Sequence, residues 1–370
     1  MSLKQRGYLS ALICVVCVGF IGYRWYREVT TYVPNIGQLP SQEAVDAALR
    51  DGTDHPDRVL IPTGLFIQSV EFVTANDANV TGYLWQRYAD DVPETVSRGF
   101  VFPEQVASDA TVIEEQYRRR VGAAEVIGWY FDVTVREPFD YSKYPLDTQD
   151  IWLRIWHKDF DRDVVLVPDL GAYDATGITD VFGVDSEIVP GGWRIEDTYF
   201  SYRRTNYDTN FGIPDYIGQR DFPELYFNVT LARSFVNAFV IALVPLFVVL
   251  ILLYAVLIMA TADKEKAEVM GFNATGAIGA STALLFVVML AHIDLRREFQ
   301  ASGLVYLEYF YLATYAAVLG VSLNVYLFSA RGGGRILDFL HRDDNLFPKL
   351  AFWPAVLLFL AVVTAMVFRA

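Results

Sequence analysis

The order of hydrophobic and polar residues divides the chain into two different halves. Between residues 59 and 231, apolar residues come in short runs such as Leu65–Val70, separated by turns rich in Asn, Asp, Gly and Pro. Runs of this kind without interleaved helices predict the strands of an all-β sandwich. Within residues 232–370, four apolar runs are each long enough to cross a membrane as a helix. They cover residues 233–260, 274–294, 303–328 and 350–369.

A shorter apolar run lies near the N-terminus. It extends from Tyr8 to Tyr23 and has basic residues on both sides. Residues 1–27 are therefore predicted to be either a signal peptide or an N-terminal membrane anchor. Both alternatives carry the following residues out of the cytoplasm. Residues 28–58 form a predicted linker with one short helix, which Ser41 can cap.

The composition agrees with a membrane protein. Of the 370 residues, 53% are hydrophobic, which is too apolar for an ordinary soluble chain. The formal net charge is −14, and the acidic excess lies in the β-rich half, which argues against nucleic acid and for attraction of cations. Basic residues such as Lys264 and Arg335 gather in connections opposite the β-rich half, which places that half outside the cell by the positive-inside tendency. Arg296 and Arg297 are an exception.

Residues suited to catalysis or metal binding do not form a set. The only cysteines, Cys14 and Cys17, lie in the N-terminal apolar run, and the four histidines are far apart. The sequence has no nucleophile–base pair, phosphate-binding loop or metal-ligand spacing. We therefore predict that the chain is not an enzyme and has no cofactor and no metal site.

A hexapeptide in the β-rich half, Tyr144-Pro145-Leu146-Asp147-Thr148-Gln149, precedes the four apolar runs by about 80 residues. It is followed by the stretch Gly192–Glu196, by Arg233 just before the first run and by Pro245 within that run. In this order, these features resemble the pentameric ligand-gated ion channels (the Cys-loop receptor superfamily) over residues 58–370. The cysteines that flank the hexapeptide in many members are absent, as is typical of prokaryotic members.

The resemblance implies a homopentameric ligand-gated ion channel in a bacterial inner membrane, with the sandwich on the periplasmic or extracellular side. Its expected partners are identical subunits, a small-molecule or proton agonist, inorganic ions and the lipid bilayer. The alternative is a non-conducting membrane sensor of the same fold that binds a ligand and signals through a partner protein.

Five charged residues are expected at the border between the sandwich and the membrane. Arg233 precedes the first span, where a low dielectric strengthens ion pairs. The resemblance implies that Asp147 in the hexapeptide and Asp77 in a hairpin are its partners and couple the two halves. Arg296 and Arg297, after the second span, are expected to face the same hexapeptide. The alternative is a static ion pair beside solvated loop charges.

The second span contains the predicted pore face. Residues three or four positions apart share one face of a helix, and here they are Asn273, Ala277, Ser281, Leu284, Val288 and Ala291. Five copies would form a polar constriction at Asn273 and Ser281. A hydrophobic ring at Leu284 and Val288 would gate by dewetting. The alternative is that small residues only permit close helix packing. Cation-selective members carry Glu where this chain has Asn273, but Glu268 and the acidic sandwich favour cations.

Aromatic residues form the predicted ligand site between neighbouring sandwiches. They are Trp156 and Phe160 after one strand, Tyr202, Tyr207 and Phe211 near the last hairpin, and Trp129 from the facing side. Aromatic faces bind amine cations, whereas nearby arginines would favour acids, so the ligand class stays open. The alternative for each of these residues is a place in the sandwich core.

Overall fold

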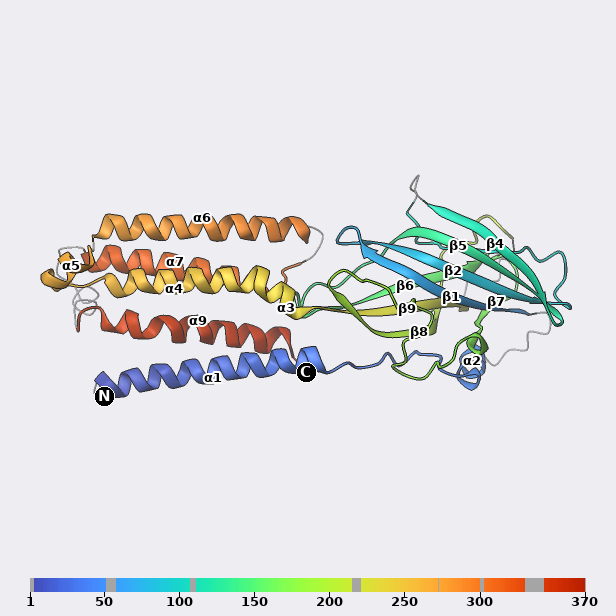
Figure 1. Cartoon of the computed structure of the whole chain (residues 1–370), viewed down its shortest axis with the longest axis horizontal. Coiled ribbons are helices and arrows are strands. Elements are labelled where there is room, and N and C mark those ends of the chain that lie inside the picture. Colours follow the sequence, from blue (N-terminus) through green and yellow to red (C-terminus); the bar gives the residue numbers. More distant parts are fainter. Residues whose placement is uncertain are drawn as a thin grey trace. The chain divides into compact units, whose positions relative to one another are not determined.

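The computed structural model describes residues 3–50, 58–106, 111–214, 221–271, 273–299, 303–329 and 343–369. Two compact units make up the chain (Figure 1). The β unit contains Tyr32–Phe139 and Thr148–Arg233. The helical unit contains Met1–Thr31, Asp140–Asp147 and Ser234–Ala370. The segment Asp140–Asp147 therefore belongs with the helices, although strands flank it in the sequence.

The β unit is a sandwich of two sheets, as predicted (Figure 1). One sheet has the strand order β4-β5-β2-β1-β7. Its strands are β1 (Val59–Phe72), β2 (Asp77–Ala89), β4 (Val112–Val121), β5 (Ala124–Arg136) and β7 (Val164–Pro168). The other sheet has the order β3-β6-β9-β8. Its strands are β3 (Phe100–Val101), β6 (Thr148–His157), β8 (Trp193–Thr205) and β9 (Phe222–Arg233).

The strands follow the alternation of the sequence. In β2, every second side chain from Ala78 to Tyr88 is buried and those between are half-buried, because successive side chains of a strand point to opposite faces. The inward side chains of both sheets form one core, in which Leu65, Phe131 and Phe227 are fully buried. This common core fixes the register of the strands, since a slip of one residue would turn every inward side chain outward.

The linker before the sandwich contains the predicted short helix, α2 (Gln42–Leu49). The Ser41 hydroxyl accepts a hydrogen bond from the backbone N–H of Ala44 at 3.3 Å, which confirms Ser41 as the N-cap. Val45 of α2 is completely buried in the sandwich core. The only other helical piece described in the β unit is the 3₁₀ turn η1 (Leu170–Ala172).

The helical unit contains five helices that are long and apolar enough to cross a membrane. Four follow the sandwich in the sequence, as predicted, and the fifth is the N-terminal helix. The helices of this unit are α1 (Leu3–Thr30), α3 (Phe235–Ala238), α4 (Val244–Met259), α5 (Lys264–Met270), α6 (Ala274–Glu298), α7 (Glu308–Ser329) and α9 (Leu346–Val367). The helix α1 is longer than the run Tyr8–Tyr23 that the sequence suggested.

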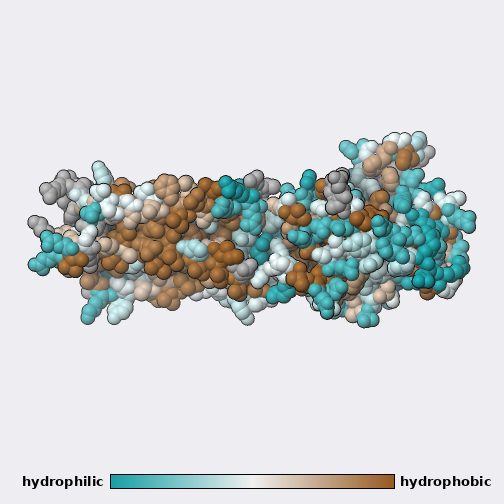
Figure 2. Space-filling model, turned by 45° about the horizontal axis from the view of Figure 1, so that its top comes forward, coloured by the Kyte–Doolittle hydropathy of each residue, from teal (hydrophilic) through white to brown (hydrophobic). Residues whose placement is uncertain are grey.

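The long helices lie side by side with α6 at one edge of the bundle and α1 at the other (Figure 1). Helices α4 and α7 both contact α6, and α9 lies between them and α1. Their surface is mainly hydrophobic, whereas the sandwich carries many hydrophilic residues (Figure 2). An apolar surface of this kind suits helices that face lipid. The chain is a multi-pass membrane protein by its candidate spans.

The first span after the sandwich is irregular near its start. A π-helical segment, η3 (Phe239–Leu243), separates α3 from α4, and Pro245 lies in the first turn of α4. Proline has no N–H, so the regular hydrogen bond to the carbonyl of Ile241 cannot form. The local π geometry accompanies this break in the helical hydrogen-bond ladder.

Candidate functional site

Four of the six predicted ligand residues form one aromatic cluster in the β unit. Trp156, at the end of β6, stacks on Phe160 with ring centroids 5.5 Å apart. Tyr207 and Phe211, from the connection between β8 and β9, meet Trp156 edge-on at 5.8 and 6.3 Å. Phe211 is 43% exposed, so one side of this aromatic cluster is open to solvent.

Charged residues frame the aromatic cluster. Glu224 of β9 is buried and accepts hydrogen bonds from the Tyr207 hydroxyl at 2.5 Å and from the Trp156 indole at 2.9 Å. Arg154 of β6 donates to both Glu224 and Glu104, and its guanidinium lies 5.3 Å from the centre of the Trp156 ring. Two carboxylates and one guanidinium leave a formal excess of one negative charge.

Burial and neighbouring charges shift the pKa values of Arg154 and Tyr207. Burial by itself lowers the pKa of Arg154, but the hydrogen bond to Glu104 and the nearby negative charges outweigh it and raise that pKa above its usual value. Burial also raises the pKa of Tyr207, and the hydrogen bond to Glu224 adds to the effect. Arg154 therefore stays charged and Tyr207 stays neutral over the physiological pH range.

Two atoms of this frame have unused hydrogen-bonding capacity. One carboxylate oxygen of Glu104 (Oε2) and the Nε–H of Arg154 are buried and find no hydrogen-bond partner in the part of the chain that the structure describes. Buried polar groups are usually paired, directly or through water. The frame can therefore accept a further hydrogen bond from a cationic or neutral donor at Glu104.

The sequence did not predict the charged frame of Arg154, Glu104 and Glu224. A signal for part of it was present, because Arg154 and Trp156 are two residues apart in a strand and so project from the same face. Glu224 pairs with this face only through the β6–β9 register, in which Arg154 lies opposite Tyr226. That register is set by the tertiary structure.

The other two predicted ligand residues pack in or against the core of the sandwich. Trp129 is 7% exposed and packs edge-on against Phe100 at 5.6 Å. The Tyr202 hydroxyl donates to the carbonyl of Leu166 at 2.9 Å. Both side chains therefore take the structural role within the chain that was the alternative to ligand binding.

The predicted coupling residues of the β unit have local partners. Asp77 is the first residue of β2 and forms an ion pair with Arg136 at 2.6 Å. Hydrogen bonds from Arg136 lower the pKa of Asp77. The Arg233 guanidinium lies 4.1 Å from the centre of the Trp193 ring, which is opposite Arg233 in the β8–β9 ladder. The trio of Asp77, Asp147 and Arg233 stays a prediction.

The hexapeptide begins in a segment that packs on the helices. Tyr141 and Tyr144 contact the ring of Phe299 with centroids 4.8 and 4.6 Å apart. The backbone N–H of Tyr306 donates to the carbonyl of Ser142 at 2.9 Å, and that of Leu307 donates to Tyr144 at 3.1 Å. Since Phe299 ends α6 and Leu307 precedes α7, the segment is tied to both sides of the α6–α7 connection.

Charged residues of the helical unit form hydrogen bonds and ion pairs across the α6–α7 connection. Glu308 is 1% exposed; it accepts from the backbone N–H of Val305 at 2.8 Å and pairs with Arg296 at 3.2 Å. The imidazole of His292 lies 3.3 Å from the same carboxylate. Arg297, in contrast, is exposed and pairs with Asp294 at 3.4 Å. Of the two predicted arginines, Arg296 is thus built into the connection and Arg297 faces outward.

The predicted pore residues divide between two environments. Ser281 and Val288 are buried within the chain, with 0% and 1% exposure. The others are half-buried or, for Asn273, exposed; they are Asn273, Ala277, Leu284 and Ala291. Asn273 is the N-cap of α6 and accepts from the backbone N–H of Gly276 at 2.6 Å. The face around Ser281 and Val288 therefore packs on neighbouring helices of the same chain.

A different face of α6 is open. Its exposed residues lie on the side of the helix opposite Ser281 and Val288. From the N-terminal to the C-terminal end of α6 they are first small, then large and apolar, and finally charged: Gly276, Gly279, Ala283, Phe286, Leu290, Asp294 and Arg297. Leu290 and Phe286 are 61% and 56% exposed. Because α6 lies at the edge of the bundle, no other described helix of the chain covers this open face.

Comparison with known proteins adds no relative. No protein-family model matches the chain, and no curated protein matches it. A β-sandwich followed by four long apolar helices is consistent with the channel family that the hexapeptide suggested.

Proposed function

We propose that the chain is the subunit of a homopentameric ligand-gated ion channel with an aromatic ligand site in the sandwich and a pore lined by α6. The observation that carries the proposal is the docked segment Asp140–Asp147. It follows β5 and precedes β6 in the sequence, yet it belongs with the helices and is tied to the α6–α7 connection. A shift of β6 would therefore pull on the end of α6, as a two-state coupling of distant sites requires.

The open face of α6 supports a pore. Five copies around an axis would place Gly279 and Ala283 in one half of the channel and rings of Phe286 and Leu290 in the other. Apolar rings gate by dewetting when the helices tilt or move apart. The face with Ser281 and Val288 would remain packed on its own subunit, which differs from the face that the sequence pattern suggested.

The aromatic cluster supports an organic ammonium ligand. Trp156 and Phe211 offer ring faces that attract cations, and Glu104 and Glu224 give the site its negative excess. Arg154 does not favour a carboxylate ligand, because its charge is already matched by these two glutamates. Residues from a neighbouring sandwich would complete the site.

The proposal is tested by reconstituting the purified protein and recording current across a planar bilayer. The pH, amines, carboxylates and divalent cations are screened in turn, and the mass of the detergent-solubilised particle gives the number of subunits. Agonist-evoked current from a five-subunit particle is the expected result. Silence under every condition, shared by the variant Leu290→Ala, would favour a non-conducting sensor.

Current through the channel is expected to be carried by cations. The exposed Glu268 of α5 and the acidic sandwich would concentrate cations near the pore. Under a salt gradient, the reversal potential should follow the cation equilibrium potential, and Glu268→Gln should reduce the cation preference. A reversal potential that follows chloride would contradict this prediction.

Replacing Trp156 by Ala is expected to raise the half-maximal concentration of an amine agonist by about tenfold, which lies between the worth of an exposed and that of a desolvated cation–π contact. Trp156→Phe keeps a ring face but loses the hydrogen bond to Glu224, so its shift should be smaller. Concentration–response curves measure both. Equal curves for the wild type and Trp156→Ala would exclude this aromatic cluster as the ligand site.

A further inference from the structure

We infer that α1 is a retained fifth membrane span of the mature subunit and that it positions the segment that couples ligand binding to the pore. The first part of this inference is independent of the proposed channel function. The second part rests on it, because the segment Asp140–Asp147 is the proposed coupling element.

The end of α1 near Ser10 completes the hydrogen bonding of α9. Pro354 lies inside α9 and has no N–H, so the carbonyl of Leu350 lacks its regular donor four residues on. The Ser10 hydroxyl donates to this carbonyl at 2.7 Å. In a membrane, a backbone carbonyl without a donor is costly, and side chains of neighbouring helices commonly satisfy the groups that proline frees. Removing α1 would expose this carbonyl to lipid.

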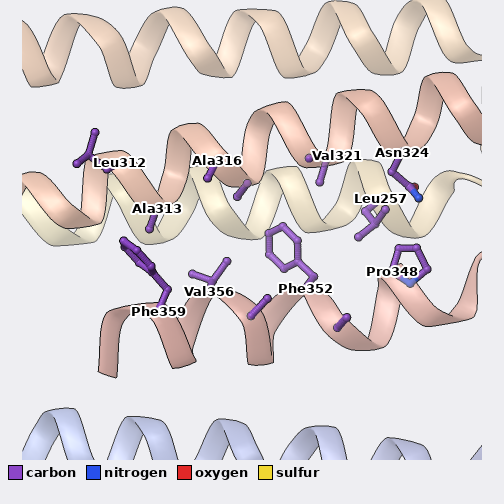
Figure 3. A pocket seen from close by; sticks show the side chains of 14 residues that line it. Leu257, Leu312, Ala313, Ala316, Val321, Asn324, Pro348, Phe352, Val356 and Phe359 are labelled. Atoms are coloured by element: carbon purple, nitrogen blue, oxygen red, sulfur yellow. The ribbon is translucent and has the colours of Figure 1, made fainter. Parts of the chain in front are cut away.

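Packing also makes α9 depend on α1. Open pockets flank α9 on both sides: one of ≈ 360 Å³ lies between α9 and α7, and one of ≈ 490 Å³ lies between α9 and the N-terminal part of α1. Figure 3 shows Phe352, Val356 and Phe359 of α9 pointing toward small side chains of α7, such as Ala313 and Ala316. The most extensive contacts of α9 with another helix are those with α1. The contacts with α1 therefore supply the largest share of the helix–helix packing of α9, and removing α1 would forfeit that dispersion energy.

The opposite end of α1 reaches the coupling segment. The Trp25 indole N–H donates to the Tyr306 hydroxyl at 2.9 Å. The backbone N–H of Tyr306 donates in turn to the carbonyl of Ser142. Glu28 pairs with Lys143 of the same segment at 2.5 Å. Trp25 also packs on Phe310 at the start of α7, with centroids 6.2 Å apart. The C-terminal end of α1 therefore touches both partners of the coupling contact.

The contacts of α1 with other helices distinguish it from a cleaved signal peptide. A cleaved leader leaves the protein, so its side chains cannot be required by the rest of the fold. Here Ser10 and Trp25 each satisfy a group of another segment. Cys17 and Ile21, between them, are 5% and 7% exposed.

Retention is tested by intact mass spectrometry of the full-length protein purified from membranes. The expected mass includes the residues of α1. A mass that lacks the residues up to Tyr23 or beyond would overturn the inference. This measurement needs no channel activity, so a failure of the proposed function leaves its outcome unaffected.

The positioning role is tested with Trp25→Phe, which removes the indole N–H and keeps an aromatic ring. Hydrogen exchange of peptides covering residues 141–146 and 303–310 should become about fivefold faster, as expected for the loss of one hydrogen bond. Tyr26→Phe is the matched control, because Tyr26 is 68% exposed, and it should leave exchange unchanged. Unchanged exchange in Trp25→Phe would overturn the positioning role.

The Ser10 contact has its own pair of variants. Ser10→Ala should lower the unfolding midpoint in detergent by a few degrees, whereas Ser10→Thr, which keeps a hydroxyl, should retain it. Equal loss in both variants would point to packing at Ser10 instead of the hydrogen bond. No loss in either would show that α9 does not depend on this contact.

Discussion

Cysteine at position 290 of α6 is expected to react with a charged, water-soluble thiol reagent and to reduce the agonist-evoked current by about tenfold or more. Leu290 is 61% exposed on the open face, so five modified side chains would crowd the proposed apolar constriction. A ring of charges there would also alter dewetting and ion passage. The expected effect is large because, in the proposed pentamer, every subunit would contribute one modified residue to the same cross-section.

The matched control is Val288→Cys, two residues away but 1% exposed. It should react slowly and leave the current almost unchanged. Both variants are made after replacing Cys14 and Cys17 by Ala, since these are the native thiols. Rapid block at Val288 and none at Leu290 would restore the pore face that the sequence pattern suggested.

Glu137→Gln is expected to stabilise the sandwich at pH 8 and to flatten its dependence on pH. Glu137 is 2% exposed, and its two carboxylate oxygens receive the backbone N–H of Trp152 at 3.2 Å. Burial raises the pKa of Glu137 to about 9, an effect that the Trp152 N–H opposes and the charge of Glu104 reinforces. At pH 8 the wild-type side chain must take up a proton on folding, because the unfolded chain has it ionised, and a neutral amide avoids this cost.

The direction of the pH effect follows from proton linkage. The folded state keeps a proton on Glu137 up to a pH of about 9, whereas an unfolded chain releases it near its ordinary pKa of about 4.5. The stabilisation is therefore complete below about pH 4.5, falls as pH rises, and levels off above about 9. The slope attributable to this group is at most about 1.4 kcal/mol per pH unit in between.

The measurement is best made between pH 7 and 8.5. Burial lowers the pKa of His157 to about 4. The contribution of this histidine to the stability of the fold is therefore lost only as pH falls from about 6.5 towards 4, and at higher pH the imidazole is neutral in both the folded and the unfolded state. Unfolding of the full-length protein by denaturant, followed by hydrogen exchange in β6 peptides, gives the stability of the sandwich. The exposed Glu71 supplies the control variant Glu71→Gln. An equal slope in the wild type and Glu137→Gln would contradict the prediction.

The proposed ligand site was partly predictable from the sequence. Trp156, Phe160, Tyr207 and Phe211 come together because the aromatic residues at the end of one strand and in the last hairpin meet where β6 and β9 pair. Trp129 carried the same sequence signal and lies in the core, since an aromatic residue of a sandwich fits both places. Only the packing of the two sheets separates these alternatives.

The sequence by itself determined which elements exist. Alternation with period two gave the strands, continuous apolar runs gave the spans, and Ser41 marked the start of α2, because each of these signals is local to its segment. The tertiary structure decided which side of each element is used. Helix α6 is apolar on nearly all sides, so its sequence does not distinguish the buried face from the exposed face. The Asp77–Arg136 pair and the contact of Ser10 with α9 join segments that are distant in the sequence, and only packing selects such partners. Packing against distant helices also decides which face of α6 stays open.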